Sequence, residues 1–320
     1  MTSPVAQFRQ LREHLEQQVI GQPELIEHLL IAILADGHLL VEGPPGLAKT
    51  RAVQALANGI ESDFHRVQFT PDLLPADLTG TDIYRPETGE FNFQPGPLFH
   101  NLVLADEINR APAKVQSALL EAMAERQITV GKTTYPLPTL FTVMATQNPL
   151  EQEGTYPLPE AQLDRFLMHL TVDYPDAAVE QQILRLNRRE SASQEAPAFN
   201  KLHQEQIFQA RQEVINVHMD DAIENYLVAL IIATRQPGEY DPELASWLQV
   251  GASPRATIAL DRCARARAWL AGKDFVTPDD VQAMLHQVLR HRIILSYEAE
   301  ADGVSKDQVI DRILTKVPAV

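Results

Sequence analysis

The sequence predicts an α/β fold, in which a parallel sheet flanked by helices is followed by a mainly helical second domain. Short apolar runs of strand length occur at 38–42, 101–105 and 140–145, and they alternate with helical stretches such as 113–125. Strand signals largely vanish from Asp176 onward, where helical periodicity dominates. Strands that alternate with helices favour a parallel sheet, because each connecting helix covers a face of that sheet.

The elements are expected in the following order. Two amphipathic helices, at 8–19 and 24–35, are separated by a Gly-Gln-Pro break. The strand at 38–42 then leads through a Pro/Gly turn into a helix at 50–59. A polar loop is expected at 190–200. The later helices are expected at 177–189, 201–216, 220–234, 254–270 and 277–295.

Length and composition predict a folded protein of two domains. The 320 residues exceed a usual single domain, and 45% hydrophobic with 22% charged residues is close to the average for globular proteins. The change of pattern near Tyr174 and Pro175 predicts an α/β domain at 1–174 and a helical domain at 175–320. The single cysteine, Cys263, excludes an internal disulfide and is expected to be a packed thiol.

Charge and hydropathy restrict the classes of partner. The 43 acidic residues outnumber the 27 basic ones, and the formal charge of −16 would repel a phosphate backbone over most of the surface. Nucleic acid is therefore an improbable partner. The chain start lacks the apolar run of a secretory signal, and the early apolar stretch 29–35 is too short for a bilayer. We expect a cytoplasmic protein without a membrane span.

A phosphate-binding loop is expected between the first strand and its helix. A glycine-rich loop that opens a helix points backbone N–H groups and the positive end of the helix dipole at phosphates. Lys49 would reach the β- and γ-phosphates of a nucleotide, and the Thr50 hydroxyl would ligate Mg²⁺. The alternative is an ordinary Pro/Gly turn. The segment nearly matches G-x-x-x-x-G-K-[ST] and consists of Gly43, Pro44, Pro45, Gly46, Leu47, Ala48, Lys49 and Thr50.

Ala48 occupies the position of the last glycine of that pattern. Alanine tolerates fewer backbone conformations than glycine. We therefore expect the loop to place Ala48 in the ordinary right-handed region.

Two carboxylates follow the second apolar run. Leu102 to Ala105 lead directly into Asp106 and Glu107, at the carboxyl end of a strand, where open α/β sheets bind ligands. Asp106 would hold Mg²⁺ through its water shell, and Glu107 would polarise the attacking water as general base. The alternative is a simple helix entry, which becomes less favoured downstream of a phosphate loop.

Three further polar residues are candidates for the same chemistry. Asn148 follows the third apolar run and could fix the attacking water, although an Asx-type turn before Pro149 is the alternative. Arg165 is either a functional cation or the partner of Asp164 in a surface ion pair. Arg255 lies in the first turn of a helix, where it opposes the helix dipole, and this favours a role toward phosphate.

Taken together, these segments resemble the MoxR family of AAA+ ATPases, over roughly residues 19–292. The resemblance implies a P-loop AAA+ core with an all-helical lid domain, ATP and Mg²⁺ as cofactors, and ATP hydrolysis. It also implies that Asn148 is sensor 1, that Arg165 is an arginine finger offered to the neighbouring subunit, and that Arg255 is sensor 2, in cis or in trans. An alanine at position 48 is usual in this family. The segments that carry the resemblance are 43–50, 106–112, 148–149 and 251–256.

The resemblance extends to assembly and partners. An intersubunit arginine implies a homo-oligomeric ring, with six subunits expected and the number left open. Gly21 and Gln22 resemble the family segment near the adenine. Members of the family act as chaperone-like remodellers that mature partner proteins or insert metal into them, often partners with von Willebrand A domains.

Two hairpins are expected by the same resemblance. One would span 78–97 with its turn at Thr88-Gly89, and the other 128–137 with its turn at Gly131-Lys132. Both could line a pore or grip a client, or they could be surface hairpins that pack against the sheet. The leading functional hypothesis is an ATP-driven remodeller of proteins. The alternatives are a nucleic-acid motor of helicase type, a non-hydrolysing nucleotide-dependent scaffold and the ATPase subunit of a metal chelatase.

Overall fold

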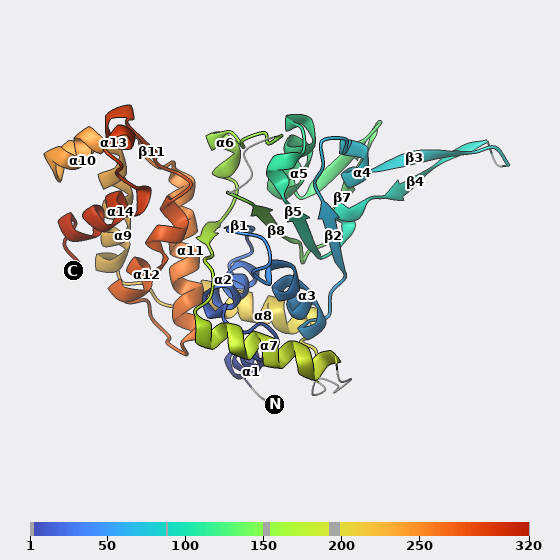
Figure 1. Cartoon of the computed structure of the whole chain (residues 1–320), viewed down its shortest axis with the longest axis horizontal. Helices are drawn as coiled ribbons and strands as arrows, with labels where there is room; N and C mark the ends of the chain where they lie inside the picture. Colours follow the sequence, from blue (N-terminus) through green and yellow to red (C-terminus); the bar gives the residue numbers. More distant parts are fainter. Residues whose placement is uncertain (1–2, 88, 150–153, 192–198, 320) are drawn as a thin grey trace. The chain divides into compact units, whose positions relative to one another are not determined.

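The computed structural model describes residues 3–87, 89–149, 154–191 and 199–319 (Figure 1). Its contacts divide the chain into two compact units. The first unit comprises Met1–Leu158 with Leu170–Ile207, and the second comprises Pro159–His169 with Phe208–Val320. These bounds differ from the predicted domains, because residues 175–207 group with the α/β unit. The division into domains at residue 174 stays a prediction.

The first unit contains a five-stranded sheet in the order β2-β5-β8-β1-β9, which confirms the predicted α/β class. The pairs β2–β5, β5–β8 and β1–β8 are parallel. Strand β8 therefore lies between β1 and β5, and the carboxyl ends of all three meet at one edge of the sheet. The bounds are Leu39–Glu42 for β1, Phe64–Gln68 for β2, Leu102–Asp106 for β5, Thr142–Gln147 for β8 and Met168–Thr171 for β9.

Four of the predicted helices accompany this sheet. Helix α2, Pro23–Leu34, contacts β1 and is apolar on almost every side, which explains why it is nearly all buried. Helix α3, Lys49–Gly59, contacts β2 and β5. Helix α1, Pro4–Gln18, contacts both α2 and α3, whereas α5 occupies Ala113–Glu125 as predicted. The first unit also contains α7, Ala177–Ser191, which is two residues longer than expected.

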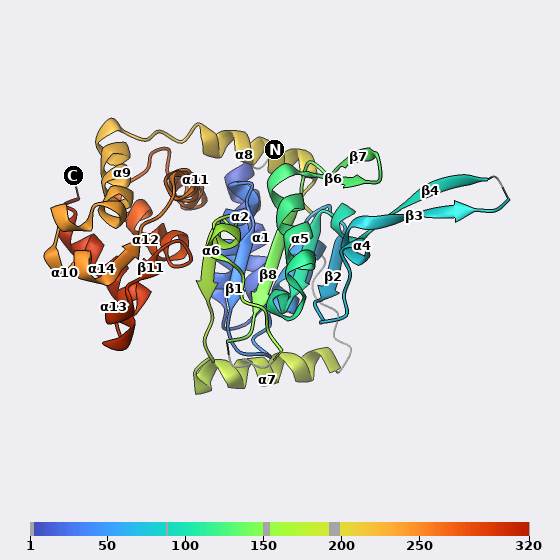
Figure 2. The same ribbon diagram turned by 90° about the horizontal axis from the view of Figure 1, so that it is seen from above.

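Both predicted hairpins are present. Strands β3, Gly80–Arg85, and β4, Glu90–Pro95, form a hairpin that extends away from the sheet in both views (Figures 1 and 2). The second hairpin pairs β6, Gln127–Val130, with β7, Thr133–Pro136, and turns at Gly131 with φ +60°. Thr88, part of the first predicted turn, lies outside the described residues.

The second unit is mainly helical, as predicted. Helix α8, Gln204–Ile215, begins in the first unit and continues into the second. The other elements are α6 Glu160–Leu163, α9 Asp221–Arg235, α10 Pro242–Trp247, β10 Leu248–Val250, α11 Pro254–Leu270, α12 Pro278–Leu289, β11 Ile294–Leu295, α13 Tyr297–Ala301 and α14 Lys306–Lys316.

One predicted helix is wrong at its C-terminal end. The helix expected at 277–295 ends at Leu289, and Ile294–Leu295 instead pair with β10 as strand β11. The reason is tertiary, because His291 and Arg292 turn toward backbone carbonyls of the segment 164–167. Within the described residues, none of the helices has both the length and the apolar character needed to cross a bilayer.

Candidate active site

The predicted phosphate loop joins β1 to α3 with two residues in the left-handed region. Gly46 has φ +84°, and Ala48, the N-cap of α3, has φ +57°. The expectation of a right-handed Ala48 is therefore wrong. The left-handed conformation costs an alanine about 1 to 2 kcal/mol, and such strain concentrates where a loop must present its amides to a ligand.

The start of the loop is held close to neighbouring strands. Gly43 N–H donates to the Gln147 carbonyl at 3.2 Å, and a Cβ on Gly43 would collide with the Val172 carbonyl oxygen. Lys49 Nζ donates to the Gly43 carbonyl at 2.6 Å. The loop is thereby closed between the ends of β8 and β9, with the lysine folded over its first residue.

The Lys49 ammonium lies in the field of the acidic pair. Burial lowers its pKa, and the charges of Asp106, Glu107 and Glu42 oppose that shift. The predicted phosphate-binding lysine and the two predicted carboxylates are thus brought together at one edge of the sheet. Opposite charges facing each other suit a site in which a polyphosphate and a divalent cation neutralise both sides.

Thr146 ties the two carboxylates to the neighbouring strand. Its hydroxyl donates to Asp106 Oδ1 at 2.6 Å and accepts from the Glu107 backbone N–H at 2.9 Å. Thr146 is 1% exposed, so water does not compete for these bonds. Glu107 itself has φ +57°, another left-handed residue at the site. The sequence indicated the strand that carries Thr146 but not this bridging role.

Strand β2, which sequence reasoning missed, supplies two more contacts. Arg66 Nη2 lies 2.7 Å from Asp106 Oδ2, and Gln68 Nε2 donates to Glu107 Oε2 at 2.8 Å. Arg110 Nε also pairs with Glu107 Oε2 at 3.0 Å. The polar-apolar alternation around Val67 was the available signal, but β2 is half exposed and has only one fully buried residue. The side chains of β2 are not apolar enough for the sequence to indicate a strand there.

Asn148 follows β8 directly and is 7% exposed. Because β8 pairs with β5 through Ala145 and Ala105, Asn148 comes three residues beyond that pair, at the edge where Asp106 also ends its strand. Thr50 and Asp106 carry oxygen donors of the hard kind that Mg²⁺ prefers. The residues present therefore fit the predicted magnesium ion.

A pocket of about 590 Å³ adjoins the phosphate loop. Its walls come from Pro45 to Ala48, from the turn after α1 that includes Gln22, and from α7. Gly21 faces α7, where a Cβ would collide with the Val179 side chain. Arg51 donates to the Gln18 carbonyl and pairs with Glu190, which joins α1, α3 and α7 around the pocket. The mixed apolar and polar lining suits a purine base.

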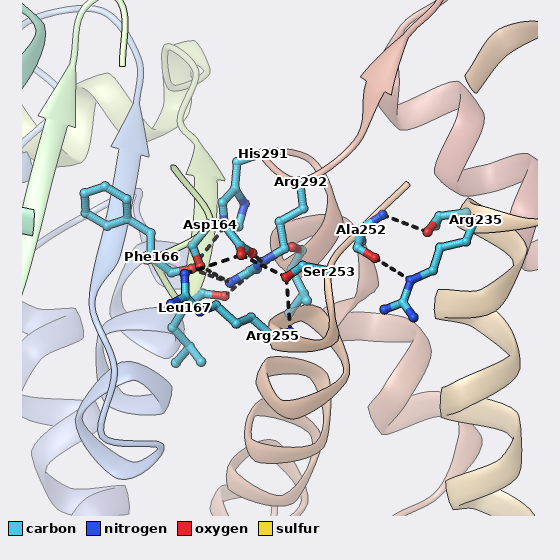
Figure 3. Close-up of polar contacts among 11 residues, drawn as sticks. Asp164, Phe166, Leu167, Arg235, Ala252, Ser253, Arg255, His291 and Arg292 are labelled. Carbon is cyan, nitrogen blue, oxygen red and sulfur yellow. Dashed lines mark hydrogen bonds and ion pairs between the residues drawn. The ribbon is translucent and has the colours of Figure 1, made fainter. Parts of the chain in front are cut away.

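The two predicted arginines belong to the second unit. Figure 3 shows Arg255 and its surroundings. Arg165 follows the single turn of α6, with its N–H on the Gln162 carbonyl at 3.1 Å. Arg255 is the second residue of α11, and its side chain is 56% exposed with Nη1 3.6 Å from Asp164 Oδ2. Asp164 also binds Ser253 and Arg292, so it is not simply the surface partner of Arg165.

Comparison with known proteins defines the class. Residues 38–168 match the family described as "ATPase family associated with various cellular activities (AAA)", and residues 245–313 match the AAA lid domain. A crystal structure provisionally described as an ATPase, from Cytophaga hutchinsonii, superposes with a TM-score of 0.92 at 48% identity, covering 99% of this chain and 96% of that one. The fold and these matches together define a nucleotide-binding ATPase of the AAA class.

Two curated relatives narrow the family. Chaperone MoxR1 of Mycobacterium tuberculosis is 44% identical over 301 residues, which is 93% of this chain and 78% of the relative. The uncharacterised protein YeaC of Bacillus subtilis is 45% identical over 306 residues, which is 95% of this chain and 92% of the relative. The chain belongs to the MoxR family of AAA+ ATPases.

Proposed function

We propose that this ATPase hydrolyses Mg-ATP at the strand ends of its first unit, and that a ring of copies uses the hydrolysis to remodel protein clients. The observation that carries the proposal is the placement of Lys49, at the N-terminus of α3, opposite Asp106 and Glu107. A phosphate-binding cation and two carboxylates at one sheet edge are what phosphoryl transfer to water requires.

The roles follow from the positions. The amides of residues 43–50 hold the phosphates, with Lys49 at the β- and γ-oxygens. Thr50 and Asp106 would hold magnesium, which supplies charge neutralisation at those oxygens when bound. Glu107, tethered by Thr146, polarises the attacking water, and Asn148 helps to orient it. The pocket lined by Gln22 and α7 receives the base.

The second unit contributes arginines in the proposed ring. Arg165 acts as the finger toward the nucleotide of a neighbouring subunit, where it stabilises charge that develops on the transferring phosphoryl group. Arg255 acts as sensor 2. A homo-hexamer is the assembly we propose, since a finger supplied in trans requires a neighbour for every site.

The β3–β4 hairpin has features that support the proposal of a protein client. Its Tyr84 and Phe91 are 52% and 68% exposed, and their rings lie 5.2 Å apart between centroids. Its base is anchored, because Phe93 stacks on Tyr135 of the second hairpin at 4.1 Å. Exposed aromatic side chains on a firmly based hairpin mark an interaction surface. A charge of −16 disfavours nucleic acid as the client.

Phosphate release from purified protein tests the hydrolysis step. Lys49→Ala and Glu107→Gln are expected to abolish turnover, as is removal of Mg²⁺ with EDTA. Arg165→Ala is expected to lower kcat by about 10³ to 10⁵. Full turnover in Arg165→Ala would reject its assignment as a finger.

Stimulation of hydrolysis by DNA that weakens steeply with salt would favour a nucleic-acid motor instead.

Client binding is tested in the Glu107→Gln background with ATP. The first client to test is a protein with a von Willebrand A domain, because the relationship to the MoxR family suggests such a partner. Replacing Tyr84 and Phe91 by serine is expected to abolish its capture while leaving basal hydrolysis of the parent unchanged. Tyr297→Ser is the matched control, because Tyr297 is an 82% exposed aromatic of the second unit. Equal capture by both variants would remove the hairpin from client recognition.

A further inference from the structure

One buried arginine of the second unit, Arg292, holds the residue that precedes the proposed finger. Arg292, in the turn after α12, points toward the segment 164–167 (Figure 3). Its guanidinium makes five hydrogen bonds, to the Asp164 carboxylate and carbonyl and to the carbonyls of Phe166, Leu167 and Val288. Arginine has five N–H donors, so every one of them is used.

These bonds fix the backbone on both sides of Arg165. Arg292 holds Asp164 before it and Phe166 after it, and His291 Nε2 donates to the same Phe166 carbonyl at 3.1 Å. The Arg292 side chain is 2% exposed. Burial lowers its pKa, whereas the Asp164 charge opposes that shift. A buried cation with all its donors engaged is a fixed support rather than a ligand-binding group.

The Asp164 carboxylate carries the same support to Arg255. Its Oδ1 accepts from Arg292 Nε at 2.8 Å, while its Oδ2 accepts from the Ser253 hydroxyl at 2.8 Å and lies 3.6 Å from Arg255 Nη1. Ser253 is the N-cap of α11, so it also sets where the helix of Arg255 begins. One carboxylate thus connects the two segments that bear arginines.

The loop before Arg255 is held on its other side. Arg235 Nε donates to the Ala252 carbonyl at 2.6 Å, and Ala252 N–H donates to Thr234 Oγ1 at 3.0 Å. A Cβ on Gly251 would collide with the Thr234 carbonyl oxygen. Helix α9 therefore fixes the loop from one side while Asp164 engages it from the other.

We infer that Arg292 is a positioning residue for hydrolysis, which through Asp164 holds Arg165 and Arg255 in one fixed arrangement. The inference rests on the proposed function, because it assumes that both arginines act on nucleotide. Arg292 touches no substrate. Its effect should therefore appear on kcat, with ATP binding by the first unit preserved.

Arg292→Lys is the first variant to measure, because lysine keeps the charge but lacks the planar fork of donors. A misplacement of about 1 Å costs about 10²-fold in rate, so kcat is expected to fall about 10²-fold. The Kd for a fluorescent ATP analogue should change less than about twofold. Arg267→Lys is the matched control, because Arg267 pairs with the buried Asp280 of the same unit at 2.7 Å. Its kcat should stay within about twofold of the parent.

Mixed rings separate positioning in trans from a local defect. Protomers with Glu107→Gln have an inactive site but an intact finger, whereas Arg292→Lys protomers have the reverse. Mixing the two should restore turnover, as it should for Arg165→Ala mixed with Glu107→Gln. Rescue of Arg165→Ala but not of Arg292→Lys would show that Arg292 does not act through Arg165, and would overturn that half of the inference. Failure of Arg165→Ala itself to lose activity would instead reject the proposed finger.

Folding is controlled by circular dichroism and by size-exclusion chromatography with ATP. Should Arg292→Lys not fold, Asp164→Asn decides, because an asparagine oxygen still accepts from Arg292 while the charge facing Arg255 is lost. This variant is expected to lower kcat at least tenfold with an unchanged Kd for the nucleotide analogue. Folded Asp164→Asn or Arg292→Lys with the kcat of the parent would overturn the inference.

Discussion

Asp106 of the first unit and Asp164 of the second are each paired with an arginine, but the two arginines lie in opposite surroundings. The Arg66 side chain beside Asp106 is 47% exposed, whereas that of Arg292 beside Asp164 is 2% exposed. The two carboxylates themselves are almost equally covered, at 16% and 17%. The two ion pairs therefore differ in the exposure of the arginine and in the other groups that hydrogen-bond to it.

This difference indicates two uses of the same chemical pair. An exposed pair contributes only about 0 to 1 kcal/mol, because water competes for both ions, so Arg66 can release Asp106 to another cation. Loss of one partner from a buried pair costs about 3 to 5 kcal/mol, because a charge is left without compensation. In the proposed function, Asp106 belongs to a site that must exchange ligands, whereas Asp164 belongs to one that must stay in place.

Among the changes that test this comparison of the two carboxylates, the largest effect is expected from Asp106→Asn. Loss of a proposed Mg²⁺ ligand should lower kcat by about 10³ or more, since metal catalysis supplies several kcal/mol. The free energy of unfolding should change by less than about 1 kcal/mol, because the partner Arg66 is exposed and an asparagine oxygen can still accept from the Thr146 hydroxyl. Phosphate release and urea denaturation measure the two quantities. A loss of several kcal/mol in stability with normal turnover would reverse the assignment of Asp106.

A second expectation compares the two arginines by the same substitution. Arg292→Met should lower the free energy of unfolding by about 3 to 5 kcal/mol, and Arg66→Met by at most about 1 kcal/mol. Urea denaturation in low and high NaCl measures both. Only the small Arg66 effect should shrink further with salt, because mobile ions screen exposed charges. Equal losses for the two variants would contradict the comparison.

The comparison also explains what the sequence could predict. Helix α3 and the strands β1, β5 and β8 were predicted correctly, because each depends on neighbours within a few positions along the chain. Strand β2 was missed, since its half-exposed side chains lack a strong apolar pattern. The contacts of Gln68 and Arg66 with the acidic pair were lost with it.

The hydrogen bonds between Arg292 and the segment 164–167 could not have been predicted from neighbouring positions in the sequence. Asp164 and Arg292 are separated by 128 positions, and the turn at His291 and Arg292 replaced a helix that periodicity had favoured. Local helix propensity is overridden where buried hydrogen bonds to residues far away in the sequence stabilise a different backbone conformation. The conformation of Ala48 was wrong for a related reason, because the surrounding loop imposes a left-handed residue despite its local cost.

Ala48→Gly should have a smaller effect on the phosphate loop. Glycine relieves about 1 to 2 kcal/mol of left-handed cost, and the freer unfolded chain takes back about 0.4 to 1 kcal/mol. The expected net gain in stability is therefore between about 0 and 1.6 kcal/mol. Ala52→Gly is the matched control, because the same change inside helix α3 should destabilise by about 1 kcal/mol. Both are measured by urea denaturation, and destabilisation by Ala48→Gly would show that the loop is not strained there.

The smallest effect concerns Cys263, whose thiol lies in the second unit at 0% exposure. Burial raises its pKa to about 12 from an ordinary value of 9.0. The native state therefore keeps a proton that the unfolded chain releases, so the thiol's contribution to stability is complete below pH 9 and is lost as pH rises toward 12. At pH 8 stability and turnover should be independent of it, and iodoacetamide should not label the native protein.

Labelling of Cys263 then reports on how strongly the buried Arg292 stabilises the second unit. Only molecules that open the second unit expose a reactive thiol, so the labelling rate follows the free energy of opening. Arg292→Met should accelerate labelling at pH 8, whereas Arg66→Met should leave the rate unchanged. Mass spectrometry of timed samples measures both rates. Rapid labelling of the parent protein would show that the interior around Cys263 is open to water, and the contrast between an exchangeable and a fixed ion pair would then lose its physical basis.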